Sequence, residues 1–147
     1  MIIRPYADRD EAQTAGVWFR SGKATYTFLP TWQALTRTEA DRVFRDRIAA
    51  RCELWVAEKD GSVVAYLAMD GSYVDRLYVD PEEIGKGTGK LLLDKAKALQ
   101  PQGLELHTHQ ENHQACRSYE GNGFTAVKFG ISPPPEEAPD VEYHWRP

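Results

Sequence analysis

The stretch that decides the fold is Leu77-Tyr78-Val79-Asp80-Pro81-Glu82-Glu83-Ile84-Gly85-Lys86-Gly87-Thr88-Gly89-Lys90. An apolar strand ends at Asp80-Pro81, a short loop follows, and a helix is expected to begin among the glycines. The first N–H groups of a helix have no partner within it and carry partial positive charge, which suits a phosphate. Glycine lets the backbone approach the anion, and Lys86 and Lys90 add positive charge. The stretch therefore predicts a phosphate-binding turn between a strand and a helix.

Three kinds of phosphate-binding loop compete for these glycines. A P-loop needs two glycines five positions apart and then Lys-Ser or Lys-Thr, but Ile84 occupies the first glycine position and Leu91 follows Lys90. A dinucleotide-binding loop needs glycines at its first, third and sixth positions; Gly85 and Gly87 fit, but Lys90 is the sixth residue. A loop for the pyrophosphate of an acyl-CoA needs only the strand, the glycines and the helix start, and all are present. A flexible turn without a ligand stays open as the alternative.

Hydrophobic periodicity outward from this loop predicts a mixed order of strands and helices. Three β-rich runs precede the loop and are separated by Asp60-Gly61 and Asp70-Gly71, which predicts an antiparallel meander. Near the N-terminus, Asp8 and Glu11 have the spacing of a capping box, and residues 21–36 are expected to form a loop with short helical pieces. The expected strands are residues 2–6, 54–57, 63–68, 73–79, 104–108, 124–129 and 141–145, and the expected helices are residues 9–20, 36–48, 87–99 and 114–121.

Length and composition indicate one globular domain over residues 1–147, with 41% hydrophobic and 27% charged residues. The formal net charge of -4 disfavours nucleic acid as a partner, because phosphate binding needs a basic surface. No signal peptide and no apolar stretch of about 20 residues is present, so we expect a cytoplasmic protein that makes no membrane contact. Cys52 and Cys116 are expected to be free thiols, and no spacing of Cys or His predicts a metal site.

A second run carries a family resemblance: Asn112-His113-Gln114-Ala115-Cys116-Arg117-Ser118-Tyr119-Glu120-Gly121-Asn122-Gly123-Phe124. With the glycine loop, it resembles the GNAT superfamily of acetyl-CoA-dependent N-acetyltransferases, in its small bacterial single-domain form. That family repeats Asn, Ala, Tyr-Glu and Gly-Phe at these spacings, but its glycine loop begins with Arg or Gln where Ile84 stands here. The resemblance covers nearly the whole chain. It implies an α/β (α+β) fold with one mixed, mostly antiparallel, twisted sheet of about seven strands flanked by about four helices.

The activity that the resemblance implies is transfer of an acetyl group from acetyl-CoA to a primary amine of a small molecule or peptide. The amine attacks directly in a ternary complex, with Tyr119 as the general acid toward sulfur and Asp75 as a candidate base. A solvated strand residue that pairs with Arg76 is the alternative for Asp75. The cofactor-binding residues that the resemblance implies are Leu77, Tyr78, Val79, Gly85, Lys86, Gly87, Thr88, Gly89, Lys90, Asn112 and Tyr119.

The acceptor side is predicted from fewer signals. Tyr26, Phe28 and Trp32 are expected to line the acceptor cleft, with core packing as an equal alternative. His107 and His109 alternate on one face of a strand, where His107 is a candidate substrate residue and the pair could relay a proton. A domain of the same fold that binds or senses acyl-CoA without transfer is the alternative function. Both a monomer and a homodimer are compatible with the sequence.

Overall fold

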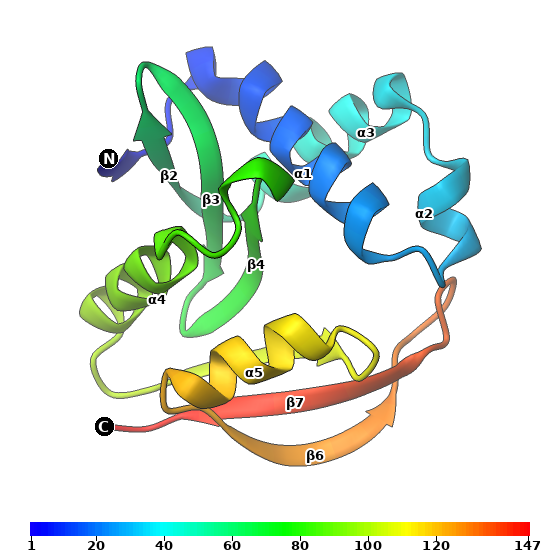
Figure 1. The fold of residues 1–147 in the computed structure, drawn as a ribbon, viewed down its shortest axis with the longest axis vertical. Coiled ribbons are helices and arrows are strands. Elements are labelled where there is room, and N and C mark those ends of the chain that lie inside the picture. The colour runs from blue at the N-terminus through cyan, green and yellow to red at the C-terminus, as the bar shows by residue number, and fades with distance from the viewer.

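The predicted meander is the centre of the structure, which is a computed structural model describing residues 1–147 (Figure 1). It consists of β2 (Glu53–Lys59), β3 (Ser62–Asp70) and β4 (Tyr73–Val79), which pair antiparallel. In the first turn, Asp60 and Gly61 both have positive φ angles, 51° and 80°, and Lys59 pairs with Ser62. These angles are those of a two-residue hairpin turn that favours Asp-Gly, so the turn prediction is confirmed.

The sheet contains seven strands in the order β1-β2-β3-β4-β5-β7-β6. Every neighbouring pair is antiparallel except β4 and β5, which are parallel. This arrangement confirms the predicted mixed, mostly antiparallel sheet. The remaining strands are β1 (Ile2–Pro5), β5 (Leu104–His109), β6 (Thr125–Ile131) and β7 (Pro139–Trp145).

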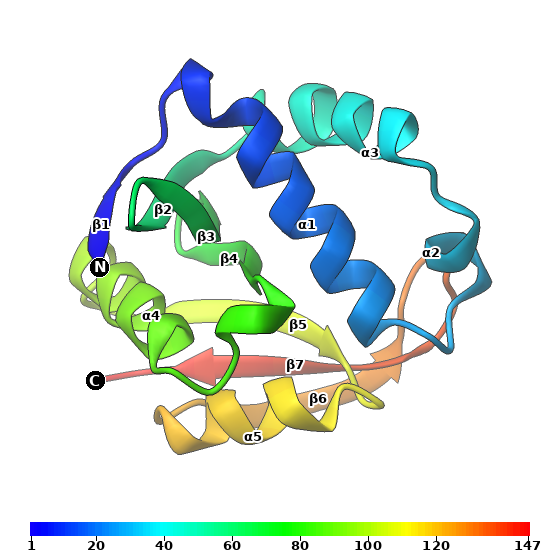
Figure 2. The ribbon, with the colours of Figure 1, turned by 45° about the horizontal axis from the view of Figure 1, so that its top comes forward.

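Helices cover both faces of the sheet (Figures 1 and 2). One face carries α1 (Glu11–Thr25), α2 (Pro30–Ala34), α3 (Arg37–Val43) and the π-helical turn η2 (Phe44–Ala49), and the other carries α4 (Thr88–Leu99) and α5 (His113–Gly121). Two short 3-10 turns, η1 (Asp8–Asp10) and η3 (Pro81–Glu83), precede α1 and α4. Alternate residues of β3 enter two separate cores: Tyr66 packs on the α1 side and Leu67 on the α4 side.

The first helix is longer than predicted, because Ser21 and Gly22 continue α1 to Thr25 instead of opening a loop. Gly22 lies directly against the ring of Trp32, where a Cβ atom would be only 2.1 Å from the ring. The glycine therefore permits the close packing of α2 on α1 and does not break the helix. The ring of Trp18 also packs edge-on against Trp32, with centroids 5.0 Å apart.

The predicted capping box of Asp8 and Glu11 is wrong, because Asp10 provides the capping carboxylate. Asp10 accepts the backbone N–H of Ala7 at 2.8 Å and both terminal nitrogens of Arg4 at 2.8 Å. Arg4 also donates to Glu58 on the neighbouring strand β2. The contact between Arg4 and Glu58 crosses from β1 to β2, so local spacing could not reveal the full arrangement.

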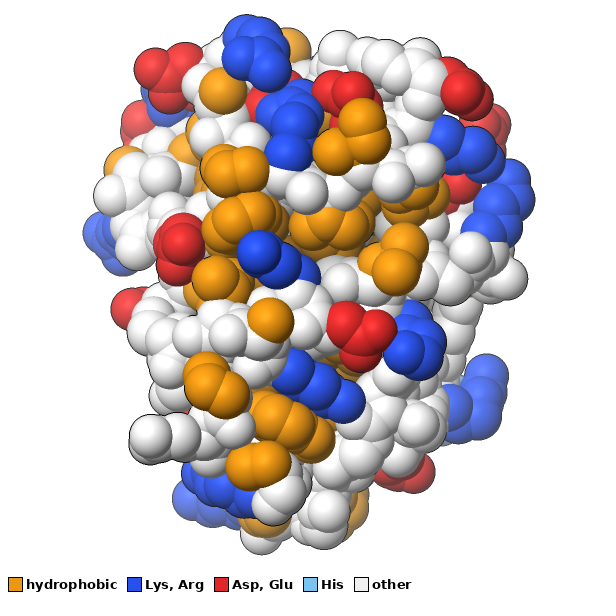
Figure 3. Space-filling model, turned by 90° about the vertical axis from the view of Figure 1, so that its left-hand side faces the viewer, with side chains coloured by type: hydrophobic (Ala, Val, Ile, Leu, Met, Phe, Trp, Pro, Cys, Tyr) orange, Lys and Arg blue, Asp and Glu red, His pale blue; other side chains and the backbone are white.

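The side of the molecule that carries α4 shows how exposed apolar groups are covered (Figure 3). Lys and Arg side chains lie across a band of hydrophobic side chains in this view. In one contact between α4 and β2, Nζ of Lys95 lies 3.9 Å from the centroid of the Trp55 ring. Long basic side chains can shield apolar surface in this way while keeping their charge in water.

Replacing Asp10 with Asn should lower the free energy of unfolding at pH 7 by about 2–4 kcal/mol, because it leaves the half-buried Arg4 charge without its main partner. The hydrogen bond from Arg4 holds the pKa of Asp10 below its usual value, against the opposing effect of burial. The carboxylate's contribution is therefore complete above its unfolded pKa of about 4 and is lost as the pH falls below that value toward the folded pKa.

Denaturant titrations of the wild type and Asp10→Asn at pH 7 and pH 3 measure both effects, and the difference between the two proteins should shrink at pH 3. The matched control is Asp8→Asn, which changes an exposed neighbouring carboxylate. Equal losses for the two variants would contradict the assignment.

Candidate active site

The parallel strands β4 and β5 are joined at one position only. Tyr73 lies opposite Glu105, whose N–H donates to Ser72 O at 3.1 Å. Beyond this pair the strands part toward their carboxyl ends (Figure 2). One side of β4 therefore has no neighbouring strand from Leu77 to Val79, and such an edge can pair with an extended ligand.

A β-bulge turns two consecutive side chains of β4 to the same face. Ala68 of β3 pairs with Arg76 and Met69 pairs with Val74, so Asp75 is the extra residue. Val74 belongs to the core on the α4 side, whereas Asp75 and Arg76 both line a cavity on the α1 side. Bulges commonly re-aim side chains beside active sites. Here the bulge brings a carboxylate and a guanidinium together, with Oδ2 of Asp75 4.0 Å from Nη1 of Arg76.

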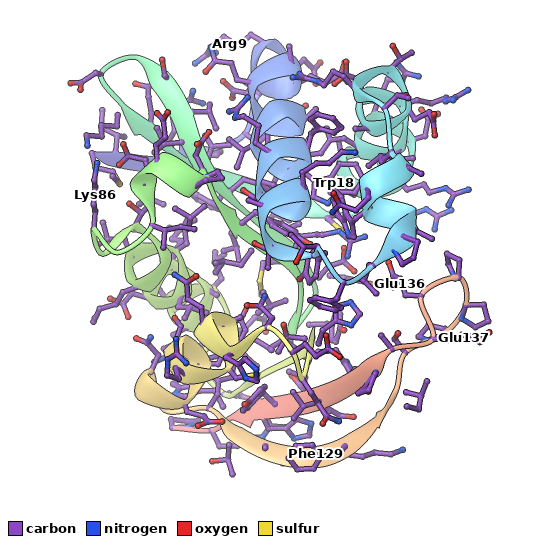
Figure 4. All side chains as sticks on the ribbon, turned by 45° about the vertical axis from the view of Figure 1, so that its right-hand side comes forward. Arg9, Trp18, Lys86, Phe129, Glu136 and Glu137 are labelled. Atoms are coloured by element: carbon purple, nitrogen blue, oxygen red, sulfur yellow. The ribbon has the colours of Figure 1, made fainter.

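The cavity on the α1 side has a volume of about 900 Å³. Its floor is formed by β4, β5, β7 and β6, and its walls by α1, α2 and the segment after β6. Figure 4 shows Trp18 of α1 beside α2, and Glu136 on the loop between β6 and β7. A cleft of this size accommodates a small molecule or an extended side chain.

Tyr119 reaches this cavity from the opposite face of the sheet. It belongs to α5, on the α4 side, and packs against Phe124 and Tyr143 with ring centroids 5.6 and 5.9 Å away. It nevertheless lines the cavity, because β4 and β5 have parted between the two faces. Burial raises the pKa of Tyr119 above its usual value, so its hydroxyl stays protonated and is able to donate a proton.

The glycine loop has the local geometry of an anion site. Gly85 and Gly87 have φ angles of 84° and 85°, a region that favours glycine, and a Cβ at either position would meet no atom within 4 Å. The N–H of Leu91 is the first in α4 to find a helical carbonyl, that of Gly87 at 3.2 Å. Nearby, the Thr88 hydroxyl is buried without a hydrogen-bond partner. The free N–H groups and this hydroxyl fit the oxygens of a pyrophosphate.

The charges around this loop are largely balanced within the protein. Lys86 lies 3.6 Å from Glu83, and Lys90 lies 2.9 Å from Asp94. Ile84, at the position where the family has Arg or Gln, is 41% exposed and therefore does not belong to the core. Any anion held here would consequently depend mainly on backbone N–H groups. Lys86 and Glu136 lie on opposite sides of the molecule, so the glycine loop and the loop between β6 and β7 are separate regions (Figure 4).

Some of the predicted acceptor and cofactor residues line the cavity, and others make different contacts. Tyr26 and Trp32 line the cavity, but Phe28 does not; it packs against Tyr26 and His109 with centroids 5.8 and 6.0 Å away. Asn112 caps α5 by accepting the N–H of Ala115 at 3.2 Å. Its contact with a cofactor stays a prediction.

His107 belongs to a cluster of polar residues on the cavity floor that the sequence analysis did not predict. Its Nδ1 lies 2.9 Å from the Tyr73 hydroxyl, and its Nε2 lies 3.3 Å from Glu142. Glu142 also contacts His144 at 2.6 Å, and this hydrogen bond is the main cause that lowers the pKa of Glu142. The alternation of Asp140, Glu142 and His144 along β7 was the available signal, because alternate strand residues share one face.

Two wider properties of the structure bear on its chemistry. No three His, Cys, Asp or Glu side chains are grouped so that they could hold a metal ion. No helix combines the length and the apolar character needed to cross a membrane.

Comparison with known proteins gives the same family from sequence and from structure. Residues 50–126 match the profile of the acetyltransferase (GNAT) domain. The peptidyl-lysine N-acetyltransferase YjaB of Salmonella typhimurium is 32% identical over 123 residues, which are 83% of this chain and 81% of the relative. The solution structure of apo YjaB from Escherichia coli superposes with a TM-score of 0.81 and 25% identity, covering 99% of this chain and 98% of the other.

A second solved structure shares the fold at lower identity. The PaiA N-acetyltransferase of Thermoplasma acidophilum, in complex with coenzyme A, superposes with a TM-score of 0.71 and 20% identity, covering 99% of this chain and 98% of that one. The family profile covers residues 50–126, and the shared architecture extends over 99% of the chain. On this evidence the chain belongs to the GNAT family of acetyltransferases.

Proposed function

We propose that this enzyme transfers an acetyl group from acetyl-CoA to the side-chain amine of a lysine in a peptide or protein. The observation that carries the proposal is the parting of β4 and β5, which lets Tyr119 of α5 and Asp75 of β4 line one cavity beside an open strand edge. The YjaB relatives are peptidyl-lysine N-acetyltransferases, which supports a lysine amine as the acceptor.

The donor would be held by two parts of the chain. The N–H groups of residues 85–90 and the hydroxyl of Thr88 would bind the pyrophosphate of coenzyme A. The open edge of Leu77, Tyr78 and Val79 would pair with its extended arm, and Asn112 is the candidate for a further hydrogen bond. Acetyl-CoA supplies the thioester whose acetyl group is transferred.

The acceptor amine would enter from the cavity and meet Asp75 before reaching the strand edge. Asp75 would accept the proton that the ammonium must lose, because only a neutral amine is nucleophilic. Backbone N–H groups at the edge of β4 would stabilise negative charge on the carbonyl oxygen, and Tyr119 would donate its proton to the departing sulfur. The position of Tyr119 beside the cavity, where β4 and β5 have parted, supports this role.

The direct test combines the protein with acetyl-CoA and a panel of lysine-containing peptides. Thiol release should depend on the peptide, and mass spectrometry should place one acetyl group on the lysine side chain. Coenzyme A binding without thiol release for any acceptor would instead support an acyl-CoA-sensing domain.

Replacing Gly87 with Val should abolish coenzyme A binding and leave the domain folded. The side chain would enter the space through which the anion approaches the backbone, at a φ angle that β-branched residues rarely adopt. Thermal shift and calorimetry with coenzyme A measure the effect. Gly61→Val is the matched control, because Gly61 has a φ of 80° and similarly open surroundings in a remote hairpin. Unchanged affinity in Gly87→Val would remove this loop from the donor site.

Replacing Tyr119 with Phe should lower kcat by about 10²-fold, the low end for general acid catalysis, because a thiolate is a fair leaving group. The ring and its packing are retained, so stability and coenzyme A affinity should change little. Steady-state kinetics with the best peptide measure kcat, and Tyr6→Phe serves as a control outside the cavity. A wild-type kcat in Tyr119→Phe would assign Tyr119 to packing alone.

Replacing Asp75 with Asn should lower kcat/KM most strongly at low pH, where the acceptor amine is mainly protonated and a base is most needed. We expect a loss of about 10²-fold near pH 7 that diminishes as the pH approaches the pKa of the amine. The pH profile of kcat/KM is the measurement, with the exposed Asp46→Asn as its control. A profile identical to that of the wild type would exclude Asp75 as the base.

A further inference from the structure

Buried polar atoms without a hydrogen-bond partner gather around the acceptor cavity. Six such side-chain atoms occur in the chain, and three of them belong to residues that line this cavity: Trp18 Nε1, Arg76 Nε and His109 Nδ1. An unpaired buried polar group destabilises a fold, so native structures usually provide a partner. A partner that the chain does not provide can come from a bound ligand. The Trp18 and Arg76 atoms are N–H donors, so the residues around this cavity carry donors for which the chain supplies no acceptor.

Arg76 is the charged member of this set, and no carboxylate of the chain bonds it closely. Its Nη1 donates to the backbone oxygen of Asp75 at 3.3 Å, and the nearest carboxylate oxygen, also of Asp75, is 4.0 Å away. That distance is beyond the 2.7–2.9 Å typical of a charge-assisted hydrogen bond. The Arg76 side chain is 36% exposed, and the residue lines the cavity. Arginine stays charged even when half-buried, so this site retains an unsatisfied positive charge.

The cavity is lined by both basic and acidic residues in addition to Arg76. Two further cations, Arg47 and Lys128, line it without an ion pair to any carboxylate. The acidic residues that line it are Asp75, Glu136, Asp140 and Glu142. Acidic residues alone would suffice for a simple amine, because electrostatic complementarity needs only the opposite sign. A cavity with unpaired cations beside acids instead complements a ligand that carries both charges.

We propose that Arg76 binds a carboxylate that the acceptor carries beside its reactive amine. This inference rests on the proposed function and narrows its substrate class to lysines with a neighbouring carboxylate. A planar guanidinium donates two parallel hydrogen bonds to a carboxylate, a geometry that lysine cannot reproduce. Two sources offer the same chemistry: an acidic side chain next to the lysine in a peptide, or the α-carboxylate of a terminal or free lysine.

Arg76 is well placed for such selection, because the bulge holds it directly beside Asp75. The acceptor's amine would face the carboxylate of Asp75 while its own carboxylate faces Arg76. Arg76 would therefore determine which amines bind well, without taking part in the chemical step.

The test compares acceptor pairs that differ only in one carboxylate. Nα-acetyl-lysine against its carboxamide tests the α-carboxylate, and a peptide with Glu beside lysine against the same peptide with Gln tests the side chain. Binding is measured by calorimetry on the coenzyme A complex, and transfer by thiol release. The variants are Arg76→Gln, Arg76→Lys and the control Arg9→Gln, whose residue is exposed and lies at the far end of α1 (Figure 4).

In the wild type and Arg9→Gln, the carboxylate form of at least one pair should bind about 10- to 100-fold more tightly, as expected for a hydrogen bond to a charged group. Arg76→Gln should remove this ratio, and Arg76→Lys should restore part of it. A structural role for Arg76 would weaken both members of a pair equally and leave the ratio unchanged. Which pair shows the preference identifies the source of the carboxylate.

Two results would overturn the inference: equal affinity for both members of each pair in the wild type, or a preference that persists in Arg76→Gln. The proposed function fails separately. A carboxylate preference in binding without thiol release would retain the Arg76 site and reject lysine acetylation. Equal transfer to the carboxylate and amide forms would retain lysine acetylation and reject the Arg76 site. If none of these acceptors bound, both the Arg76 site and lysine acetylation would be rejected.

Discussion

The single pairing between β4 and β5 is the constraint on which the rest of the site depends. If the two strands were bonded along their length, continuous backbone would separate α5 from the cavity on the other face. Because only Tyr73 and Glu105 pair, Tyr119 reaches the acceptor cavity from the α5 side. The sheet tolerates this interruption because each half is complete by itself: β4 pairs antiparallel with β3, and β5 with β7. Strand backbone without a neighbouring strand therefore lies in the middle of the sheet, where the flanking elements cover it.

The bulge at Asp75 is a second irregularity, and it places Asp75 and Arg76 together beside the cavity. Without it, Asp75 and Arg76 would point to opposite faces, and one of them would enter the apolar core on the α4 side. Cys52 Sγ lies 3.7 Å from the Asp75 carboxylate. Burial and this carboxylate raise the pKa of Cys52 to about 11, so the thiol stays protonated at neutral pH. A protonated thiol is a poor nucleophile, which limits its competition with an acceptor amine.

The sequence predicted the features that depend on neighbouring residues and missed those that depend on assembly. The Asp60-Gly61 turn and the start of α4 each arise within a few residues, and both were expected. The role of Asp10 depends on Arg4, which Glu58 of another strand holds in place. The position of Arg76 in the cavity depends on a bulge against β3, for which no local signal exists. The predicted roles of Tyr119 and Asp75 stay predictions, although both residues line the cavity as required.

The rigidity of the acceptor wall explains why charge is the more adjustable source of specificity. Trp18, Tyr26 and Trp32 line the cavity and at the same time belong to the core between α1 and β3. Trp32 stacks on Tyr26 at 5.8 Å and rests against Gly22, so any movement of the wall disturbs packing that holds α2 on α1. The charged residues of the floor stand on strands whose backbone is fixed by the sheet, and they line the cavity. Substitution among them changes which acceptor charges are matched and leaves the core intact, whereas substitution in the wall changes both.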